Sequence, residues 1–360
     1  EAVRFQTLSN DYVDSNLPFI RPKIFLNWNN LNNDKRKRDF ETSVTARSIT
    51  KGNNINTNSI NYSTTSERKY LFDGLLFQDY YGLNFDWYRN NYKSNSNENT
   101  IRFFPEIGFS TSFPLIKRKN NKIFIFQPMT QFYFNDFDNK SSKIKNEDSQ
   151  EIDLTSANIF EKNRYSGLDR KEEGIRINYG FQNRIQFESD AYIASTLGRA
   201  FHSRNQEGFN KTNGFDDKNS EIVGNIYFSN NKSTEFYYDF RLSEEFDLNK
   251  NRIKTNFDLV NTNINLAYIQ LRDFPSSNNA STEQISLTLK REFWNNWEIV
   301  LSQFRDLAGA KYSTPIRSSV GLNFLHQCAK FSINLSEDKS NDIDIPASTN
   351  LSFTIDLFGN

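Results

Sequence analysis

The chain has little of several features that define common protein classes. Its 360 residues include one cysteine, one methionine and two histidines, and its 44 basic side chains balance its 44 acidic ones. A net charge of zero gives no electrostatic reason to expect nucleic acid as a partner. No segment approaches the roughly 18 consecutive apolar residues of a membrane-spanning helix. The sequence opens at Glu1 without a methionine, a basic region or an apolar core, so we expect a segment of a longer protein.

Residues for catalysis or metal binding are equally scarce. The two histidines, His202 and His326, lie in separate segments, and no serine sits in a G-x-S-x-G elbow. Metal-binding spacings of the H-x-x-x-H or C-x-x-C kind are absent from the sequence. We therefore expect a plain loop residue at 202 and a turn residue at 326. We assign no catalytic residue, no cofactor and no metal ligand, and we expect a protein that is not an enzyme.

The residues that are present indicate β-structure. Hydrophobic residues make up only 36% of the chain, but 15% of it is aromatic, which argues against disorder. At the C-terminus, Leu351, Phe353, Ile355 and Leu357 alternate with Ser352, Thr354 and Asp356. A period of two is typical of a strand with one apolar and one polar face. Roughly 18 segments of about 10 residues show this pattern, and that length spans an outer membrane as a tilted strand.

The strand pattern favours a membrane barrel over a soluble sandwich. A sandwich buries its apolar faces inward and rarely needs so many strands. A membrane barrel turns those faces outward to lipid and keeps a polar lumen, which accommodates a mean hydropathy of −0.73. The predicted fold is all-β, an antiparallel transmembrane β-barrel built as a meander. We expect residues 1–360 to form one domain, in contact with membrane lipids.

The connections between the predicted strands alternate in length. Short turns are expected around residues 295–296, 261–263 and 230–232, and longer loops at 136–174, 198–220, 272–282 and 337–348. If the last strand ends in the periplasm, the short turns are periplasmic and the long loops external, as in outer-membrane barrels. The basic runs 35–38 and 117–119 then fall in periplasmic turns. They either contact anionic lipid head groups or are simply solvated.

One predicted external loop is unusually dense, with the sequence NRYSGLDRKEEGIRINYG at residues 163–180. Its charged residues are mixed in sign and are able to pair with one another. Gly167 and Gly174 permit backbone turns that other residues resist. Composition alone leaves two alternatives open, a structured loop folded over or into the lumen and a solvated charged loop.

This loop carries a resemblance to a known family. The run 157–180 resembles the signature of the LptD family, also called the organic solvent tolerance family of the outer membrane. The matching positions are Phe160, Asn163, Arg164, Tyr165, Ser166, Gly167, Asp169, Arg170, Glu173 and Gly174. Residues 320–360 are similar to the last three barrel strands of the family, and residues 17–28 and 77–90 follow in the expected order.

The resemblance implies a function in lipopolysaccharide transport. Members translocate lipopolysaccharide and assemble it in the outer leaflet of the Gram-negative outer membrane. Their barrel of about 26 strands is plugged by the lipoprotein LptE, and a periplasmic domain receives lipopolysaccharide from an LptA-like bridge. The chain would be the C-terminal part of such a barrel, without that domain and the first strands. Its signature loop would help to seal the lumen, and its last strand, residues 351–357, would form one side of a lateral gate.

The resemblance also gives a role to Cys328. From composition alone this residue is an unpaired, inert thiol, because the chain holds no second cysteine. Family members place a cysteine here that bonds one in the N-terminal periplasmic domain, so the resemblance implies an interdomain disulfide. Two rival functions remain at this stage, a general porin or TonB-type transporter and an outer-membrane lipid enzyme. The missing catalytic triad disfavours the enzyme.

Overall fold

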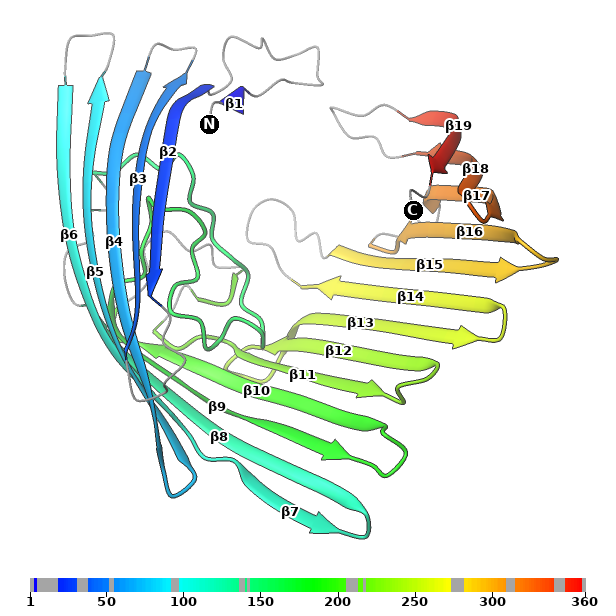
Figure 1. The fold of residues 1–360 in the computed structure, drawn as a ribbon, viewed down its shortest axis with the longest axis horizontal. Helices are drawn as coiled ribbons and strands as arrows, with labels where there is room; N and C mark the ends of the chain where they lie inside the picture. Colours follow the sequence, from blue (N-terminus) through cyan, green and yellow to red (C-terminus); the bar gives the residue numbers. More distant parts are fainter. Residues whose placement is uncertain are drawn as a thin grey trace. The chain divides into compact units, whose positions relative to one another are not determined.

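The computed structural model consists of β-strands and their connections (Figure 1). It describes residues 3–4, 19–30, 38–51, 55–91, 97–135, 140, 143–204, 213–215, 218–272, 282–308, 315–339 and 347–357. Within these ranges, no helix is long and apolar enough to cross a membrane.

The described residues form 19 strands, of which the first has only two residues. They are β1 (Val3–Arg4), β2 (Phe19–Asn30), β3 (Asp39–Lys51), β4 (Ile55–Phe72), β5 (Leu75–Asn91), β6 (Asn97–Ser112), β7 (Leu115–Lys119), β8 (Lys122–Asn135), β9 (Gly174–Gln186), β10 (Tyr192–His202), β11 (Ile222–Ser229), β12 (Thr234–Leu242), β13 (Leu248–Leu259), β14 (Thr262–Leu271), β15 (Thr282–Glu292), β16 (Trp297–Asp306), β17 (Pro315–His326), β18 (Ala329–Asp338) and β19 (Ser348–Leu357).

Successive strands pair with one another in antiparallel order. The registers run from β2 through β6 and from β10 through β19, each strand pairing with the next. β6 and the short β7 follow each other along the same partner, β8. The predicted fold class, an all-β antiparallel meander of the outer-membrane type, is confirmed.

The chain divides into two compact units that share β8, β9 and β10. Unit 1 comprises residues 1–114, 127–180 and 199–220, and unit 2 comprises residues 115–126, 181–198 and 221–360. The dense loop and β2 to β6 belong to unit 1, and β11 to β19 belong to unit 2. The expectation that residues 1–360 form one domain stays a prediction.

The three short turns predicted around residues 230–232, 261–263 and 295–296 lie where the sequence placed them. Asn231, Asn261 and Asn296 occupy the short connections after β11, β13 and β15, and each adopts a positive φ of 56°, 59° and 73°. Asparagine tolerates this left-handed backbone better than most residues, which explains its use in these turns. The long connections follow β8, β10, β14 and β18. Parts of all four lie outside the described residues.

One predicted turn is wrong. Residues 117–119 form most of β7 and pair with β8 instead of making a turn, and the turn itself is the following Asn120–Asn121 pair. The sequence pattern missed the strand because three consecutive basic residues hide its alternation. The other basic run was expected at 35–38. Residues 35–37 lie outside the described residues, and Arg38 pairs with Asp79 at 2.7 Å.

The two faces of the strands differ in chemistry as the alternation predicts. On β6, Ile101 and Phe103 are 50% and 53% exposed, whereas Arg102 and Phe104 between and beside them are fully buried. On β19, the side chains of Leu351, Phe353, Ile355 and Leu357 are all exposed. We call the side carrying these exposed apolar residues the apolar face and the opposite side the polar face. Exposed apolar side chains on every second residue suit contact with lipid.

This assignment of faces predicts the effect of a charge on β19. Replacing Phe353 with Arg should destabilise the protein in lipid vesicles by about 2–4 kcal/mol if the residue lies near mid-membrane, because a charge on the lipid face must be desolvated. The matched control is Ser352→Arg, which places the same charge on the polar face of the same strand. Unfolding in denaturant would measure both variants. Equal stabilities would contradict the assignment of the faces.

Candidate functional site

The dense loop folds against the polar face of unit 1. We use this name from here on for the whole connection from β8 to β9, of which residues 140 and 143–173 are described. The loop contacts Arg47 of β3, Tyr88 of β5 and Arg102 of β6. Short backbone contacts give the loop internal order, with Ile152 donating to Arg164 and Ser166 donating to Gln150. Between the described loop and the strands there are two groups of buried polar contacts. The first centres on Asp169 and the second on Glu172.

Polar and charged side chains lie in two neighbouring rows across β3 to β6, on the face that the loop contacts. Register places Arg47 of β3 opposite Ser59 of β4, and Arg47 donates to the Ser59 hydroxyl at 3.0 Å. Asp86 of β5 stands between its register partners, Asn61 on β4 and Arg102 on β6. It accepts hydrogen bonds from both, at 2.9 and 2.7 Å. These cross-strand pairs hold the guanidinium groups in fixed positions on the polar face.

Asp169 joins the loop to these strand side chains. Its carboxylate is fully buried and accepts from Arg47 at 2.5 Å and from the Tyr88 hydroxyl at 3.0 Å. The other oxygen accepts from the backbone N–H groups of Glu147 and Asp148, at 2.8 and 3.1 Å. A buried carboxylate with four donors is satisfied, whereas an unpaired one would cost several kcal/mol. The Asp169 side chain therefore joins the strands to the loop backbone at residues 147–148.

Arg102 also holds the loop backbone. It is fully buried, and its two terminal nitrogens donate to the carbonyls of Leu168 and Asp169, each at 2.7 Å. The neighbouring Gly167 has a φ of +74°, and a Cβ there would lie 2.5 Å from the Asp148 carbonyl oxygen. Glycine is needed at this point both for its backbone conformation and for the close approach.

Asp148 and Asp169 share the guanidinium of Arg47. Asp148 also forms an ion pair with Arg47, and its second oxygen accepts from the N–H groups of Leu168 and Asp169 at 3.0 and 3.2 Å. Burial raises the pKa of Asp169, and the nearby Asp148 adds to this, although Arg47 opposes it. Burial acts on Asp148 in the same direction, but Arg47 and the donated hydrogen bonds outweigh it and lower its pKa. One cation between two carboxylates thus makes Asp148 the more strongly ionised partner.

Glu172 centres the second group of contacts. One of its oxygens accepts from the backbone N–H of Arg164 at 2.5 Å, and the other pairs with Arg176 of β9. Arg164 donates to the amide oxygen of Asn178 at 3.0 Å, and its guanidinium lies 4.4 Å from the centre of the Phe215 ring. Every one of these side chains is buried.

The second group carries more buried cations than carboxylates. Burial lowers the pKa of Arg164 to about 9, although Glu172 favours its charged form. Burial also disfavours ionised Glu172, but Arg164 and Arg176 outweigh it and hold the pKa of Glu172 well below its ordinary value. Among the described residues, three donor atoms of Arg164 and Arg176 have no hydrogen-bond partner. This part of the loop is thus held mainly by one carboxylate between two guanidinium groups.

Comparison with known proteins decides the family. A family model described as LptD, LPS transport system D, matches residues 1–297. The chain belongs to the LptD family. It is therefore an outer-membrane protein of Gram-negative bacteria, of the class that serves lipopolysaccharide transport. A search of curated proteins finds no match.

Three solved outer-membrane receptors are distantly similar to this chain. The alcaligin outer-membrane receptor FauA from Bordetella pertussis is 11% identical, with a TM-score of 0.42. The match covers 93% of this chain and 62% of the receptor. The ferric preacinetobactin receptor BauA from Acinetobacter baumannii is 10% identical, with a TM-score of 0.39. The match covers 93% of this chain and 64% of the receptor. The ferric-catecholate import receptor Fiu from E. coli K12 is 8% identical, with a TM-score of 0.32. The match covers 95% of this chain and 72% of the receptor. The chain spans less than two thirds of the first two receptors.

The structure brings most of the LptD signature residues into the two groups of contacts. Arg164 and Asp169 are fully buried, and Tyr165 is 7% exposed. Asn163 accepts from the backbone N–H of Glu172 at 3.4 Å, and Ser166 bonds Gln150 through both backbone and hydroxyl. The Arg170 side chain donates to the Ile144 carbonyl at 3.1 Å. Of the two alternatives left open by composition, this arrangement is the structured loop.

His202 is not the plain loop residue that the sequence suggested. It is the last residue of β10, it is fully buried, and its Nε2 lies 3.7 Å from the Glu172 carboxylate. The sequence pattern missed it because the preceding Gly198–Phe201 stretch continues the strand beyond the expected boundary. His326 ends β17 beside a two-residue turn, as expected.

Sequence reasoning missed the strand residues that receive the loop. Arg47, Asp86, Tyr88 and Arg102 were not singled out, although each lies on the polar face of its strand. Charged residues at inward positions of a strand were the available signal, because an outward charge would meet lipid. Asp148 was missed for another reason, since it lies in the loop outside the signature run.

Cys328 and the last strand of this LptD chain stand apart from the loop. Cys328 is exposed in the turn between β17 and β18, and the chain has no second cysteine to pair with it. The four apolar residues proposed for the gate lie on β19, which takes its register from β18. Among the described residues, no group of three or more His, Cys, Asp or Glu side chains is placed to hold a metal ion.

The charge arrangement around Glu172 predicts a pH effect on the loop. A carboxyl group whose pKa is lowered on folding stabilises the folded state above its ordinary pKa, near 4.3, and loses that contribution as the pH falls below it. Backbone hydrogen exchange of residues 161–176 should therefore accelerate as the pH is lowered below about 4.3, after correction for the intrinsic exchange rate.

The matched variant is Glu172→Gln, which keeps the shape and removes the charge. Its exchange should already be faster at pH 7 and should change less on acidification than that of the wild type. Identical pH profiles in the two proteins would show that Glu172 does not fasten the loop.

Proposed function

We propose that this chain forms part of the conduit that translocates lipopolysaccharide and assembles it in the outer leaflet of the outer membrane. The observation that carries the proposal is the signature loop, held as a buried element on the polar face of strands whose other face is apolar. Such a wall can pass a hydrophilic saccharide on one side while remaining stable in lipid on the other. Family membership supplies the link to lipopolysaccharide.

The polar face offers the chemistry that a saccharide path needs. On the face that carries Arg47, the partly exposed hydroxyl side chains of unit 1 include Ser43, Ser63 and Thr65. Amide and hydroxyl groups exchange hydrogen bonds with sugars without a large desolvation cost. The loop occupies this face beside β3 to β6, so we infer that it narrows the path and restricts leakage.

Release of the acyl chains calls for an opening toward lipid. We infer that β19 is the last strand of a barrel of which this chain forms part, and that acyl chains leave between it and the first strand. The exposed apolar residues Leu351, Phe353, Ile355 and Leu357 would then line the exit on the lipid side. The mechanism breaks no bond, so it needs no catalytic residue and no cofactor, and the energy comes from elsewhere in the transport system.

Two protein partners follow from the family resemblance. An LptE-like lipoprotein would plug the lumen, and an LptA-like bridge would deliver lipopolysaccharide through an N-terminal periplasmic domain. Membrane lipids would surround the apolar face. The porin or TonB-type alternative has no residue-level observation in its favour. The outer-membrane lipid enzyme is disfavoured by the surroundings of His202, which is buried against the Glu172 carboxylate and the Phe215 ring.

Depletion of the full-length protein in its own cells tests the function. Lipopolysaccharide exposed at the surface, measured by labelling intact cells, should fall as the protein is lost and should recover with the wild-type gene. A gene carrying Arg102→Ala should restore it poorly, because two loop carbonyls lose their buried donor. Glu161→Ala is the matched loop control, since its side chain is exposed, and it should restore labelling fully. Unchanged lipopolysaccharide with reduced uptake of small solutes would identify a porin instead.

We further propose that Cys328 forms a disulfide with a cysteine of the N-terminal periplasmic domain. Its exposed position in a short turn of the side assigned to the periplasm supports this, because that compartment permits disulfides. Full-length protein from outer membranes should migrate differently on a denaturing gel with and without reductant, and Cys328→Ser should abolish the difference. The long loop so closed would stabilise the protein by ~4–5 kcal/mol before strain. A wild type without a shift, whose thiol reacts readily with a maleimide, would contradict the bond.

A further inference from the structure

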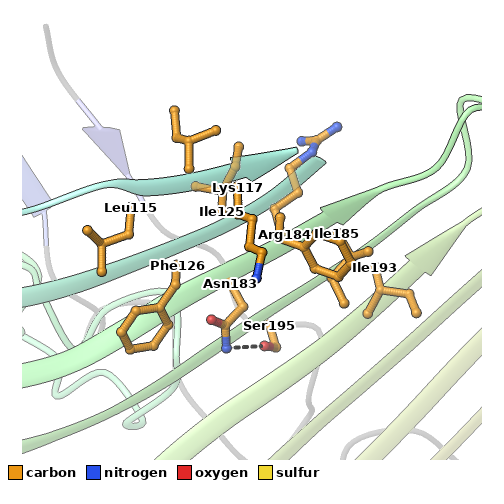
Figure 2. A pocket seen from close by; sticks show the side chains of 11 residues that line it. Leu115, Lys117, Ile125, Phe126, Asn183, Arg184, Ile185, Ile193 and Ser195 are labelled. Carbon is orange, nitrogen blue, oxygen red and sulfur yellow. Dashed lines mark hydrogen bonds between the residues drawn. The ribbon is translucent and has the colours of Figure 1, made fainter. Parts of the chain in front are cut away.

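A cavity of about 440 Å³ lies in unit 2 between the β7–β8 hairpin and the adjoining ends of β9 and β10 (Figure 2). Most of its lining is aliphatic or aromatic, including Leu115, Phe126, Ile185 and Ile193. The loop network of unit 1 contributes nothing to it. The cavity is therefore separate from the candidate site described above.

The register places the cavity on the apolar face. Leu115 pairs with Phe126 and Lys117 pairs with Phe124, so these four side chains point to the same side of the hairpin. Phe124 and Phe126 are 37% and 42% exposed and continue the alternation of β8 that carries the exposed Phe134. The cavity consequently opens toward the side of the sheet that faces lipid.

Polar groups gather at one place in this apolar lining. Asn183 of β9 donates to the hydroxyl of Ser195 on β10 at 3.3 Å, and Figure 2 shows this bond at the cavity together with Lys117. Asn183 follows Phe181 by two residues, and the Phe181 ring packs 5.5 Å from the ring of Phe126. An ammonium, an amide and a hydroxyl thus share a lipid-side cavity with aromatic and aliphatic walls.

The surrounding charge is positive. Lys117, Arg118 and Lys119 run along β7, and Lys122 opens β8, where its ammonium lies 5.1 Å from the Phe187 ring. No ion pair joins Lys117 to an acidic side chain within the described part of the chain. The nearby Glu188 accepts a hydrogen bond from the Asn121 amide at 2.9 Å instead. A cation on a lipid-facing surface without a carboxylate partner calls for a negative ligand from outside the protein.

We propose that this cavity binds one anionic phospholipid, with its phosphate at Lys117 and Ser195 and the upper part of its acyl chains along Leu115, Phe126 and Ile193. Lys117 and the Ser195 hydroxyl supply donors to phosphate oxygens, and Asn183 orients that hydroxyl. A free phosphate ion would gain nothing from the apolar walls, and a neutral lipid would leave the basic hairpin unmatched. The site sits next to the Asn120–Asn121 turn, where a head group of the bilayer surface would lie.

Native mass spectrometry of the full-length protein from outer membranes tests the proposal. The purified protein, with any partner that co-purifies, is titrated in detergent with phosphatidylglycerol or phosphatidylcholine. Wild-type protein should retain one phosphatidylglycerol in clear preference to phosphatidylcholine. Lys117→Gln should weaken this binding about fivefold, the effect expected of one basic residue near an anionic lipid surface. Ser195→Leu should also weaken phosphatidylglycerol binding, because the larger side chain fills the cavity. Leucine is apolar and therefore suits a position that faces lipid.

The matched control is Lys290→Gln. Lys290 lies on β15, three residues before the β15–β16 connection, as Lys117 lies three residues before the β7–β8 turn, but it is on the opposite face from the exposed Leu287. This variant should bind phosphatidylglycerol as the wild type does. Equal weakening by both lysine variants would overturn the site in favour of general electrostatics. Equal retention of phosphatidylcholine, or displacement of the lipid by millimolar inorganic phosphate, would overturn the proposed ligand.

Discussion

The pairing of Arg47 with Asp169 is the interaction on which the rest of unit 1 depends. Both groups are removed from water, and neither would be stable there without the other. Arg47 is fixed by its register on β3 and by the Ser59 hydroxyl, so the strands determine where the loop must place its carboxylate. The loop in turn satisfies donors that the strands would otherwise leave unpaired on their polar face.

The network explains why a connection of this length is ordered. The contacts between its described part and the strands include two carboxylate anchors, Asp169 and Glu172, and each carboxylate lies between a cation from a strand and backbone N–H groups of the loop. Two anchors resist rotation of the loop, which a single anchor would permit. A rigid element on the polar face suits a conduit that must pass a large amphiphile without becoming an open pore. This consequence links the chemistry of the signature to its proposed place in lipopolysaccharide transport.

The sequence predicted those features that depend on local pattern. Alternation along a strand is visible residue by residue, so the strands near 351–357 and the asparagine turns after β11, β13 and β15 lie where expected. The resemblance singled out Arg164 and Asp169 before any contact was known. The receiving residues could not be predicted in the same way, because only the pairing register aligns Arg47 with Tyr88 and, in the neighbouring row, Asp86 with Arg102. His202 was misjudged because β10 extends to residue 202, beyond the expected boundary, and there meets Glu172 of the loop.

Hydrogen–deuterium exchange of residues 144–172 in the full-length protein, held in native membranes, tests the central claim most directly. The comparison is between the wild type, Asp169→Ala and the exposed control Glu161→Ala. If the buried carboxylate fastens the loop, Asp169→Ala should raise exchange throughout this segment, because breaking such a pair costs about 3–5 kcal/mol. Glu161→Ala should leave the segment protected. Equal protection in all three proteins would contradict the account, because the loop would then be held without the Arg47–Asp169 interaction.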